Sequence, residues 1–193
     1  MGPFGGGKAR GLLLMVVASP RSGPRLTLAV AARDSDATDA TALRAQDKLR
    51  RMELADLVRF MRQSTLAVQA SVTAGGAPQA AVVGFVVSDR GELFFDTSSA
   101  SRKCQNLRRD PRIALVVGWD ERTVQYEGIA DEPTGVELAR LKSLYFERFP
   151  DGRERERWPD IAYFRVRPRW ARFSDFTGAT PSLQVLEFPA LPG

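Results

Sequence analysis

After residue 60 the chain is a series of short β-prone segments, separated by residues that turn a chain back on itself. Gly75-Gly76 and Asp89-Arg90-Gly91 are turn sequences of the hairpin type. The predicted strands cover 65–73, 79–88, 93–97, 113–119, 123–131 and 161–176, with an edge strand at 183–188. Strands joined by hairpins pair antiparallel, whereas a parallel sheet needs a helix after nearly every strand. The pattern therefore predicts an antiparallel barrel or sandwich.

Three helices interrupt these strands. Apolar residues at i, i+3, i+4 and i+7 from Leu54 predict an amphipathic helix ahead of the first strand. A short polar helix is expected over 98–109, because an Asp-Pro pair follows it. Thr134 and Glu137 have the spacing of a capping box, which predicts that a third helix starts there. The expected fold class is α+β, mainly antiparallel β, with flanking helices.

Residues 1–45 differ from the rest and do not contribute to the predicted fold. Positive residues followed by about seven apolar ones resemble a weak targeting segment. The apolar run is far shorter than the roughly 20 residues that span a bilayer. A disordered extension or a start-site artefact explains the same residues, and all three interpretations stay open. The folded domain is expected over 46–193.

The basic charge of the chain is concentrated near its start. Residues 1–50 carry 8 lysines and arginines against 4 acidic residues, whereas residues 51–193 carry 20 against 19. A nucleic-acid-binding domain needs a basic face on its folded body. The nearly neutral body therefore indicates that nucleic acid is not a partner, and the apolar runs indicate no membrane partner either.

Two residue types restrict the chemistry. The chain has no histidine, which excludes Ser-His-Asp catalysis, histidine-ligated zinc and haem held by a proximal histidine. It has one cysteine, Cys104, so it forms no disulfide within the chain. A reducing cytoplasm fits this composition. Difficult chemistry would have to come from a cofactor.

The segment from Thr97 to Lys103 has the composition of an anion-binding site. A predicted strand ends in four hydroxyl side chains within five residues, and a helix then begins with two adjacent cations, Arg102 and Lys103. Hydroxyls and free amides at a helix N-terminus donate hydrogen bonds, and the cations neutralise a bound anion. A helix cap followed by solvated charges explains the same residues, so both interpretations stay open on composition alone.

The order of motifs along the chain resembles a known family. Thr-Ser-x-x-Ser-Arg-Lys from Thr97, Asp-Pro-Arg-Ile-Ala-Leu-Val-Val from Asp110, and Tyr-Glu-Gly at 126–128 occur in the order typical of pyridoxamine 5′-phosphate oxidase-related, FMN-binding split barrels. The resemblance covers about 54–176. It implies a six-stranded Greek-key split β-barrel that forms a homodimer, with one FMN in each of two clefts between the subunits.

The resemblance also implies roles for particular residues. It places the FMN phosphate on Arg102, Lys103 and Thr97, with Ser98 and Ser101 as further donors. It implies that the second strand runs beside the flavin ring and offers backbone polar groups to the ring. It implies that the partner subunit contributes a tryptophan, which Trp170 matches, and a nearby cation, which Arg172 matches. The remaining positions that it implies are Ala81, Val82 and Val83 on the second strand and Gln125, which replaces a glutamine expected at Thr123.

The sequence departs from the pyridoxamine phosphate oxidases proper. Ala80 and Phe85 occupy the positions of an arginine and a lysine in those enzymes, and their C-terminal Arg-x-His motif is absent. The expected function is thus an FMN-dependent oxidoreductase acting on an unidentified small molecule, without a prediction of vitamin B6 oxidation. Three alternatives stay open: a deazaflavin-dependent reductase on the same fold, a non-catalytic flavin carrier or sensor, and a nucleic-acid-binding barrel.

Several other residues have two interpretations. Val82, Phe95 and Trp170 would form an apolar wall for the flavin ring. Trp119 and Trp158 are expected to be packing residues.

In the last long strand, Phe164, Val166 and Trp170 alternate with three arginines, which predicts that the three apolar side chains share one face. The arginines fit a solvated face better than a grip on an anion. These arginines are Arg165, Arg167 and Arg169.

Overall fold

The computed structural model describes residues 52–189, and the interpretations of residues 1–45 lie outside that range. Its helices and strands are α2 (Leu54–Met61), β1 (Leu66–Val72), β2 (Pro78–Gly84), β3 (Val86–Val87), β4 (Leu93–Ser98), α3 (Arg102–Arg109), β5 (Arg112–Val117), β6 (Arg122–Asp131), α4 (Gly135–Arg148), α5 (Gly152–Arg155), β7 (Ile161–Asp175) and β8 (Ser182–Glu187). None of the helices in this range is long and apolar enough to cross a membrane.

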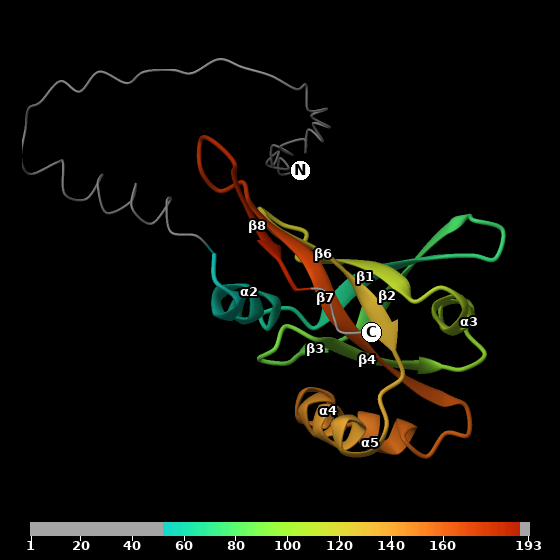
Figure 1. Cartoon of the computed structure of the whole chain (residues 1–193). Helices are drawn as coiled ribbons and strands as arrows, with labels where there is room; N and C mark the ends of the chain where they lie inside the picture. Colours follow the sequence, from blue (N-terminus) through green and yellow to red (C-terminus); the bar gives the residue numbers. More distant parts are fainter. Residues whose placement is uncertain (1–51, 190–193) are drawn as a thin grey trace, which may run out of the picture. The chain divides into compact units, whose positions relative to one another are not determined.

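All strands belong to one antiparallel sheet that curls on itself. Their order is β2-β1-β5-β6-β7-β4-β3, and β8 pairs with β7. β2 pairs with β1, whereas β3 pairs with β4 at the other end of the sheet. Because β2 and β3 follow each other in the chain, they join the two ends of the sheet into an open barrel (Figure 1). With β2 and β3 taken as one bent strand, the barrel has the six expected strands, and β8 is an added edge.

The prediction of one straight strand over 79–88 is wrong at a single point. The strand breaks at Phe85, whose amide donates to the carbonyl of Thr65 and whose side chain is buried in the barrel. The residues after the break pair with a different strand from those before it. The α+β antiparallel split barrel that the sequence predicts is confirmed.

Two hydrophobic clusters hold the fold together. The larger cluster fills the barrel and includes Leu57 and Met61 of α2 and the stacked rings of Phe95 and Phe164, whose centroids are 5.7 Å apart. The smaller one lies between α4 and strands β3, β4 and β7, and Tyr145 is at its centre. Figure 1 shows α4 and α5 below β3 and β4, with α2 and α3 at opposite ends of the barrel.

The helix starts differ from the predictions. α3 begins at Arg102 rather than at 98, because Ser101 is its N-cap and accepts a hydrogen bond from the Cys104 amide. Thr134 is the N-cap of α4, but its side chain makes no capping bond, so the predicted capping box does not form. Glu137 instead binds Arg140. The loop after α4 contains the short helix α5.

A β-bulge in β7 determines which face of the sheet its later residues occupy. Gly128 of β6 pairs with Pro168, and Glu127 pairs with Trp170, so Arg169 is an extra residue. Side chains at even positions point into the barrel before the bulge, and those at odd positions do so after it. The prediction that Trp170 shares a face with Phe164 and Val166 is therefore wrong. Trp170 lies on the outer face.

Gly128 makes this bulge possible, and we expect its replacement to destabilise the fold. A Cβ atom at Gly128 would lie 2.5 Å from the Arg167 carbonyl oxygen and 2.7 Å from Cγ1 of Val166. Gly128→Ala should lower the free energy of unfolding by about 1–3 kcal/mol, as overpacking does. Gly75→Ala is the control, since no atom lies within 4 Å of its Cβ position. Equal urea midpoints for the two variants would contradict the prediction.

Candidate functional site

The end of β4 and the start of α3 carry the residues of the predicted anion site. Thr97 is the next-to-last residue of β4 and is almost fully buried. Its hydroxyl oxygen lies 3.1 Å from that of Ser101. Ser101 is also the N-cap of α3. The two hydroxyls therefore lie together at a helix N-terminus, where donors and the helix dipole favour an anion.

Ser98 and Ser99 are engaged by an acidic residue from the segment before β7. The Ser98 hydroxyl donates to the carboxylate of Asp160, and the Ser99 amide donates to its backbone carbonyl. Side chains alternate along a strand, so Ser98 points away from the side that Thr97 occupies. The Thr97–Ser101 pair therefore lacks Ser98 as an immediate neighbour.

Arg102 and Lys103 begin α3, and the helix carries Arg102 to β2. The Arg102 guanidinium donates hydrogen bonds to the side-chain carboxamide oxygen of Gln79 on β2. Asn106 fixes the helix on β1 by donating to the Ser71 hydroxyl at 3.2 Å. Lys103 is half-buried and forms no ion pair with any residue between 52 and 189. One chain thus brings the anion site and β2 together.

β2 presents its backbone and one apolar side chain to this site. It is the first strand in the sheet order, so within the described chain only β1 pairs with it along its length. Ala81 and Val83 face the barrel side, and Val83 is buried, whereas Val82 points outward with 59% of its surface exposed. This arrangement leaves polar backbone groups and an apolar side chain on the same edge.

Gln125, Trp170 and Arg172 form a second group on the outer face. Gln125 of β6 is directly opposite Arg172 of β7, and the Arg172 guanidinium carbon lies 6.0 Å from the centre of the Trp170 ring. Nε of Arg172 is buried without a hydrogen-bond partner in the described structure. β4 pairs with the start of β7, where Thr97 is opposite Ala162, whereas Trp170 lies eight residues further along β7, roughly 25 Å along the strand. One chain therefore does not bring this group to its own anion site.

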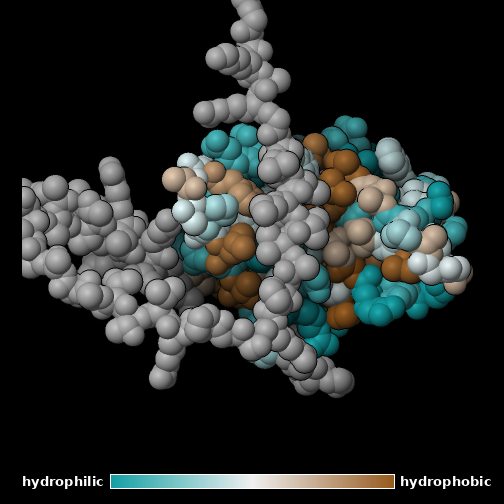
Figure 2. Space-filling view, turned by 90° about the horizontal axis from the view of Figure 1, so that it is seen from above, coloured by the Kyte–Doolittle hydropathy of each residue, from teal (hydrophilic) through white to brown (hydrophobic). Residues whose placement is uncertain are grey.

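The outer face between these two groups is apolar. The residues opposite one another across it, from β2 to β6, are Val82, Val68, Val116 and Gln125. Leu66 is exposed nearby, and a shallow groove of about 490 Å³ runs across β1, β5 and β6 beside this row. Figure 2 shows several separate hydrophobic patches among hydrophilic residues on the side seen from above. A sheet face of this kind is a usual place for a ligand or a partner.

Some residues that the sequence associated with the site lie elsewhere. Phe95 is completely buried inside the barrel, so it is not part of an outer wall. Trp119 and Trp158 are 57% and 54% exposed, so the prediction that they are packing residues is wrong. Both tryptophans lie in turns, where no repeating pattern of apolar residues indicates whether a side chain is buried.

The arginine triplet of β7 is mostly engaged in ion pairs rather than solvated. Arg165 binds Asp131 and lies 3.5 Å from the buried carboxylate of Glu92. Arg167 is 3.7 Å from Asp131, and Arg169 is the exposed residue of the bulge. The solvated-face interpretation therefore fails for Arg165, whose side chain is largely covered.

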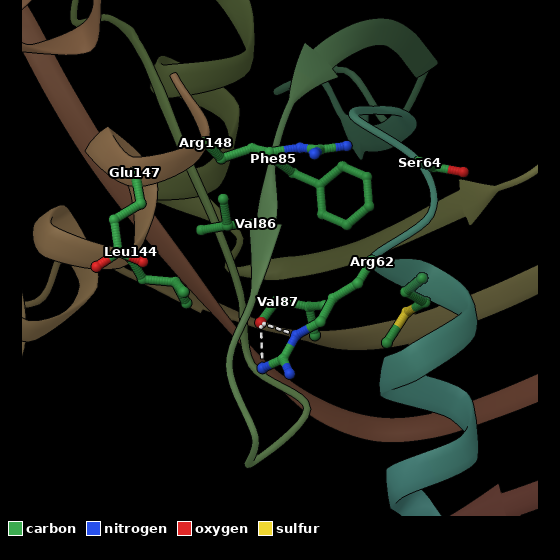
Figure 3. Close-up of a pocket in the computed structure, with 9 residues that line it drawn as sticks. Arg62, Ser64, Phe85, Val86, Val87, Leu144, Glu147 and Arg148 are labelled. Atoms are coloured by element: carbon green, nitrogen blue, oxygen red, sulfur yellow. Dashed lines mark hydrogen bonds between the residues drawn. The ribbon is translucent and has the colours of Figure 1, made fainter. Parts of the chain in front are cut away.

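A pocket that the sequence did not indicate lies between α2, β3 and α4 (Figure 3). Its volume is about 260 Å³. Its lining residues come from three distant segments and are Met61, Arg62, Ser64, Phe85, Val86, Val87, Leu144, Glu147 and Arg148. Because no local motif connects these segments, only the folded chain reveals the pocket.

The sequence comparison identifies the family. The profile of pyridoxamine 5′-phosphate oxidase matches residues 54–175, which is more than half of the chain. The chain therefore belongs to the pyridoxamine 5′-phosphate oxidase family, as its motifs suggested. A search of curated proteins found no match.

Solved structures share the fold at low sequence identity. A heme binding protein from Mycobacterium smegmatis has a TM-score of 0.61 and 22% identity, over 71% of this chain and 59% of that one. The heme storage protein HutZ from Vibrio cholerae has a TM-score of 0.53 and 22% identity, covering 61% and 92%. A pyridoxamine 5′-phosphate oxidase-related, FMN binding protein from Nostoc punctiforme has a TM-score of 0.52 and 11% identity, covering 78% and 90%.

The thiol beneath the anion site should be unreactive. Cys104 is completely buried, and burial raises the pKa of its thiol despite the cations Arg108 and Lys103 nearby. A thiol-specific reagent such as Ellman's reagent should modify the native protein at least about tenfold more slowly than the urea-unfolded protein, because the helix has to open first. Equal rates in the two states would show that Cys104 is accessible.

Proposed function

We propose that this protein is an FMN-binding oxidoreductase that holds the flavin at a homodimer interface and acts on a small molecule. One observation carries the proposal. The helix N-terminus with Thr97, Ser101, Arg102 and Lys103 lies beside the edge strand β2, whose Val82 side chain is exposed on the outer face of the sheet.

The residues of this site suit the chemical parts of FMN. Arg102, Lys103 and the paired hydroxyls supply charge and donors for a phosphate. The backbone of β2 supplies polar groups for the pyrimidine end of the ring, and Val82 supplies an apolar contact. FMN, when bound, provides hydride or electron transfer, and the chain positions it and excludes water. Ser98 is the least available of the proposed phosphate donors, because its hydroxyl already donates a hydrogen bond to Asp160.

A second copy of the chain would complete the site. Trp170 and Arg172 are four strands from β2, yet they lie on the same outer face. A twofold partner that covers this apolar face would bring its own Trp170 against the flavin of the first subunit, and the reverse contact would form at the second cleft. The unpartnered Nε of Arg172 would then have a polar group to contact. Exposed valines on this face would be buried at the same time.

Flavin suits the outer face better than heme does, although two structural relatives are heme proteins. Heme iron in proteins is held by histidine, cysteine, methionine or tyrosine. The chain has no histidine, its one cysteine is buried, and all three tyrosines are buried. Of the methionines that the structure describes, Met61 is in the core and Met52 is packed against it. The described outer face therefore offers no axial ligand.

The deazaflavin-dependent reductase and the flavin carrier or sensor stay as alternatives on the same site. Absorbance of the purified protein at the flavin bands supports FMN, whereas binding of a deazaflavin cofactor alone supports the first alternative. A bound flavin that no reductant or donor can cycle supports the second. A cytoplasmic location is part of the proposal, since a lone buried thiol suits a reducing compartment.

Mixed dimers test the proposed position of the flavin. Each cleft would use the anion site of one subunit and Trp170 of the other. Arg102→Ala/Lys103→Ala should weaken FMN binding by roughly 3 kcal/mol or more, because each charge-assisted bond contributes about 1.5–3 kcal/mol. A dimer that pairs this chain with a Trp170→Ala chain keeps one intact cleft. It should bind one FMN per two chains with wild-type affinity, measured by flavin fluorescence on doubly tagged dimers.

The control removes a positive charge from the same helix and leaves the site intact. Arg108 lies on the same helix and forms an exposed ion pair with Glu132, so Arg108→Ala should leave FMN affinity unchanged. If the mixed dimer binds no better than its two parents, the flavin does not lie between subunits. A monomer in sedimentation at micromolar concentration would contradict the dimer directly.

Riboflavin separates the two halves of the site. It lacks the phosphate, so the double variant Arg102→Ala/Lys103→Ala should lose affinity for FMN and keep its affinity for riboflavin. Trp170→Ala should lose affinity for both ligands by the same factor, because the tryptophan contacts the ring. Both affinities come from titration of flavin fluorescence. If Trp170→Ala affects only FMN, Trp170 does not contact the ring.

A further inference from the structure

We propose that the pocket between α2, β3 and α4 is a second small-molecule site, which binds an apolar molecule that carries a single carboxylate. The pocket shares none of its lining residues with the proposed flavin site. Binding there is expected with or without flavin, so this proposal and the proposed function can fail separately.

The position of the pocket explains why it is open. Met61, Phe85 and Val87 belong to the cluster inside the barrel, whereas Val86 belongs to the cluster under α4, and Leu144 packs against that cluster. β3, which separates the two clusters, is only two residues long. The two cores therefore meet along a seam that no further strand covers. The hollow of about 260 Å³ at this seam has the size of a small ligand.

The floor of the pocket is apolar and already ordered. It consists of buried side chains of the two clusters and of the half-buried Leu144. An apolar ligand body would displace water from this floor without requiring new order in the protein, which is the usual condition for a preformed site. The ligand class follows from the charges at the rim.

Arg62 is held in place on one side. Its Nε and Nη2 donate to the Val87 carbonyl at 3.3 and 3.2 Å, and Nη2 also binds Asp89 at 2.7 Å. Figure 3 shows the guanidinium against Val87 at the base of the pocket. Asp89 offsets the charge of Arg62, so this arginine shapes the pocket more than it attracts an anion.

Arg148 supplies the remaining positive charge. Figure 3 shows its side chain reaching across the top of the pocket toward Phe85, whereas the carboxylate of Glu147 points in another direction, toward Leu144. Arg148 forms no ion pair with another residue of the described chain. One unpaired guanidinium above an apolar floor is complementary to one carboxylate on an apolar body. A dianionic phosphate would need a second free cation.

A matched pair of probes tests this inference. 4-Phenylbutyrate and its neutral amide, 4-phenylbutanamide, have the same size, and only the first carries the charge. We expect the acid to bind the full-length protein, measured by isothermal titration calorimetry, at least about tenfold more tightly than the amide. The same affinity is expected in the presence of saturating FMN.

Single substitutions connect the binding to the pocket. Arg148→Gln should remove at least about tenfold of the affinity for the acid and leave that for the amide unchanged. Glu147→Gln should strengthen binding of the acid a few-fold, because it removes a nearby like charge. Leu144→Trp should fill the hollow and abolish binding of both probes. Arg59→Gln, which changes an exposed arginine one turn earlier on α2, is the control and should have no effect.

Three results would overturn the inference. The first is equal affinity for the acid and the amide, since the pocket would then not recognise the carboxylate charge. The second is an Arg148→Gln variant with wild-type affinity for the acid. The third is competition between the acid and FMN, which would place the acid in the flavin site. Absence of FMN binding together with charge-dependent binding of the acid would contradict the proposed function alone.

Discussion

The fold depends on the bend at Phe85. A sheet with two free ends exposes unpaired backbone along both of them, and the simplest way to reduce that exposure is to let one strand pair at both ends. β2 and β3 do this: the first pairs with β1, and the second pairs with β4 after the phenylalanine has turned into the core. The bend therefore closes the barrel, leaves the length of β2 at an edge, and leaves β3 too short to cover the seam beside it. The proposed flavin site and the proposed second site both follow from this one turn.

The outer face of the sheet shows how the same strands serve two purposes. Residues that point inward make the barrel core, and those that point outward form a surface with valines in its middle and charged residues at its margins. A helix N-terminus lies at one margin and a tryptophan with an arginine at the other. The distance between the margins is too large for one small cofactor to reach both within one chain. A twofold partner removes this difficulty, because it brings its own tryptophan and arginine opposite the helix N-terminus of the first subunit.

Periodic features were predictable from the sequence, and features that break a period were not. The helical spacing from Leu54 led to the correct helix, because burial on one side leaves a repeating pattern. The bulge at Arg169 leaves no such pattern, and it moved Trp170 to the opposite face from the one expected. Phe95 has the hydropathy of a wall residue and of a core residue alike, so only its place in the barrel decides between them. Arg102 and Thr97 could be proposed from the sequence because one local motif contains both, whereas Arg62 and Arg148 are far apart in the chain and line the same pocket only after folding.

The bulge also limits how the last long strand can vary. Removal of one residue near Arg169 would reverse every later position, so that Arg172 would enter the apolar interior and Phe173 would face outward. Substitutions on either face can be made one at a time, but the number of residues between Gly128's partner and the end of the strand has to stay fixed. In this part of the molecule, the number of residues therefore constrains the fold more than the identity of any single side chain does.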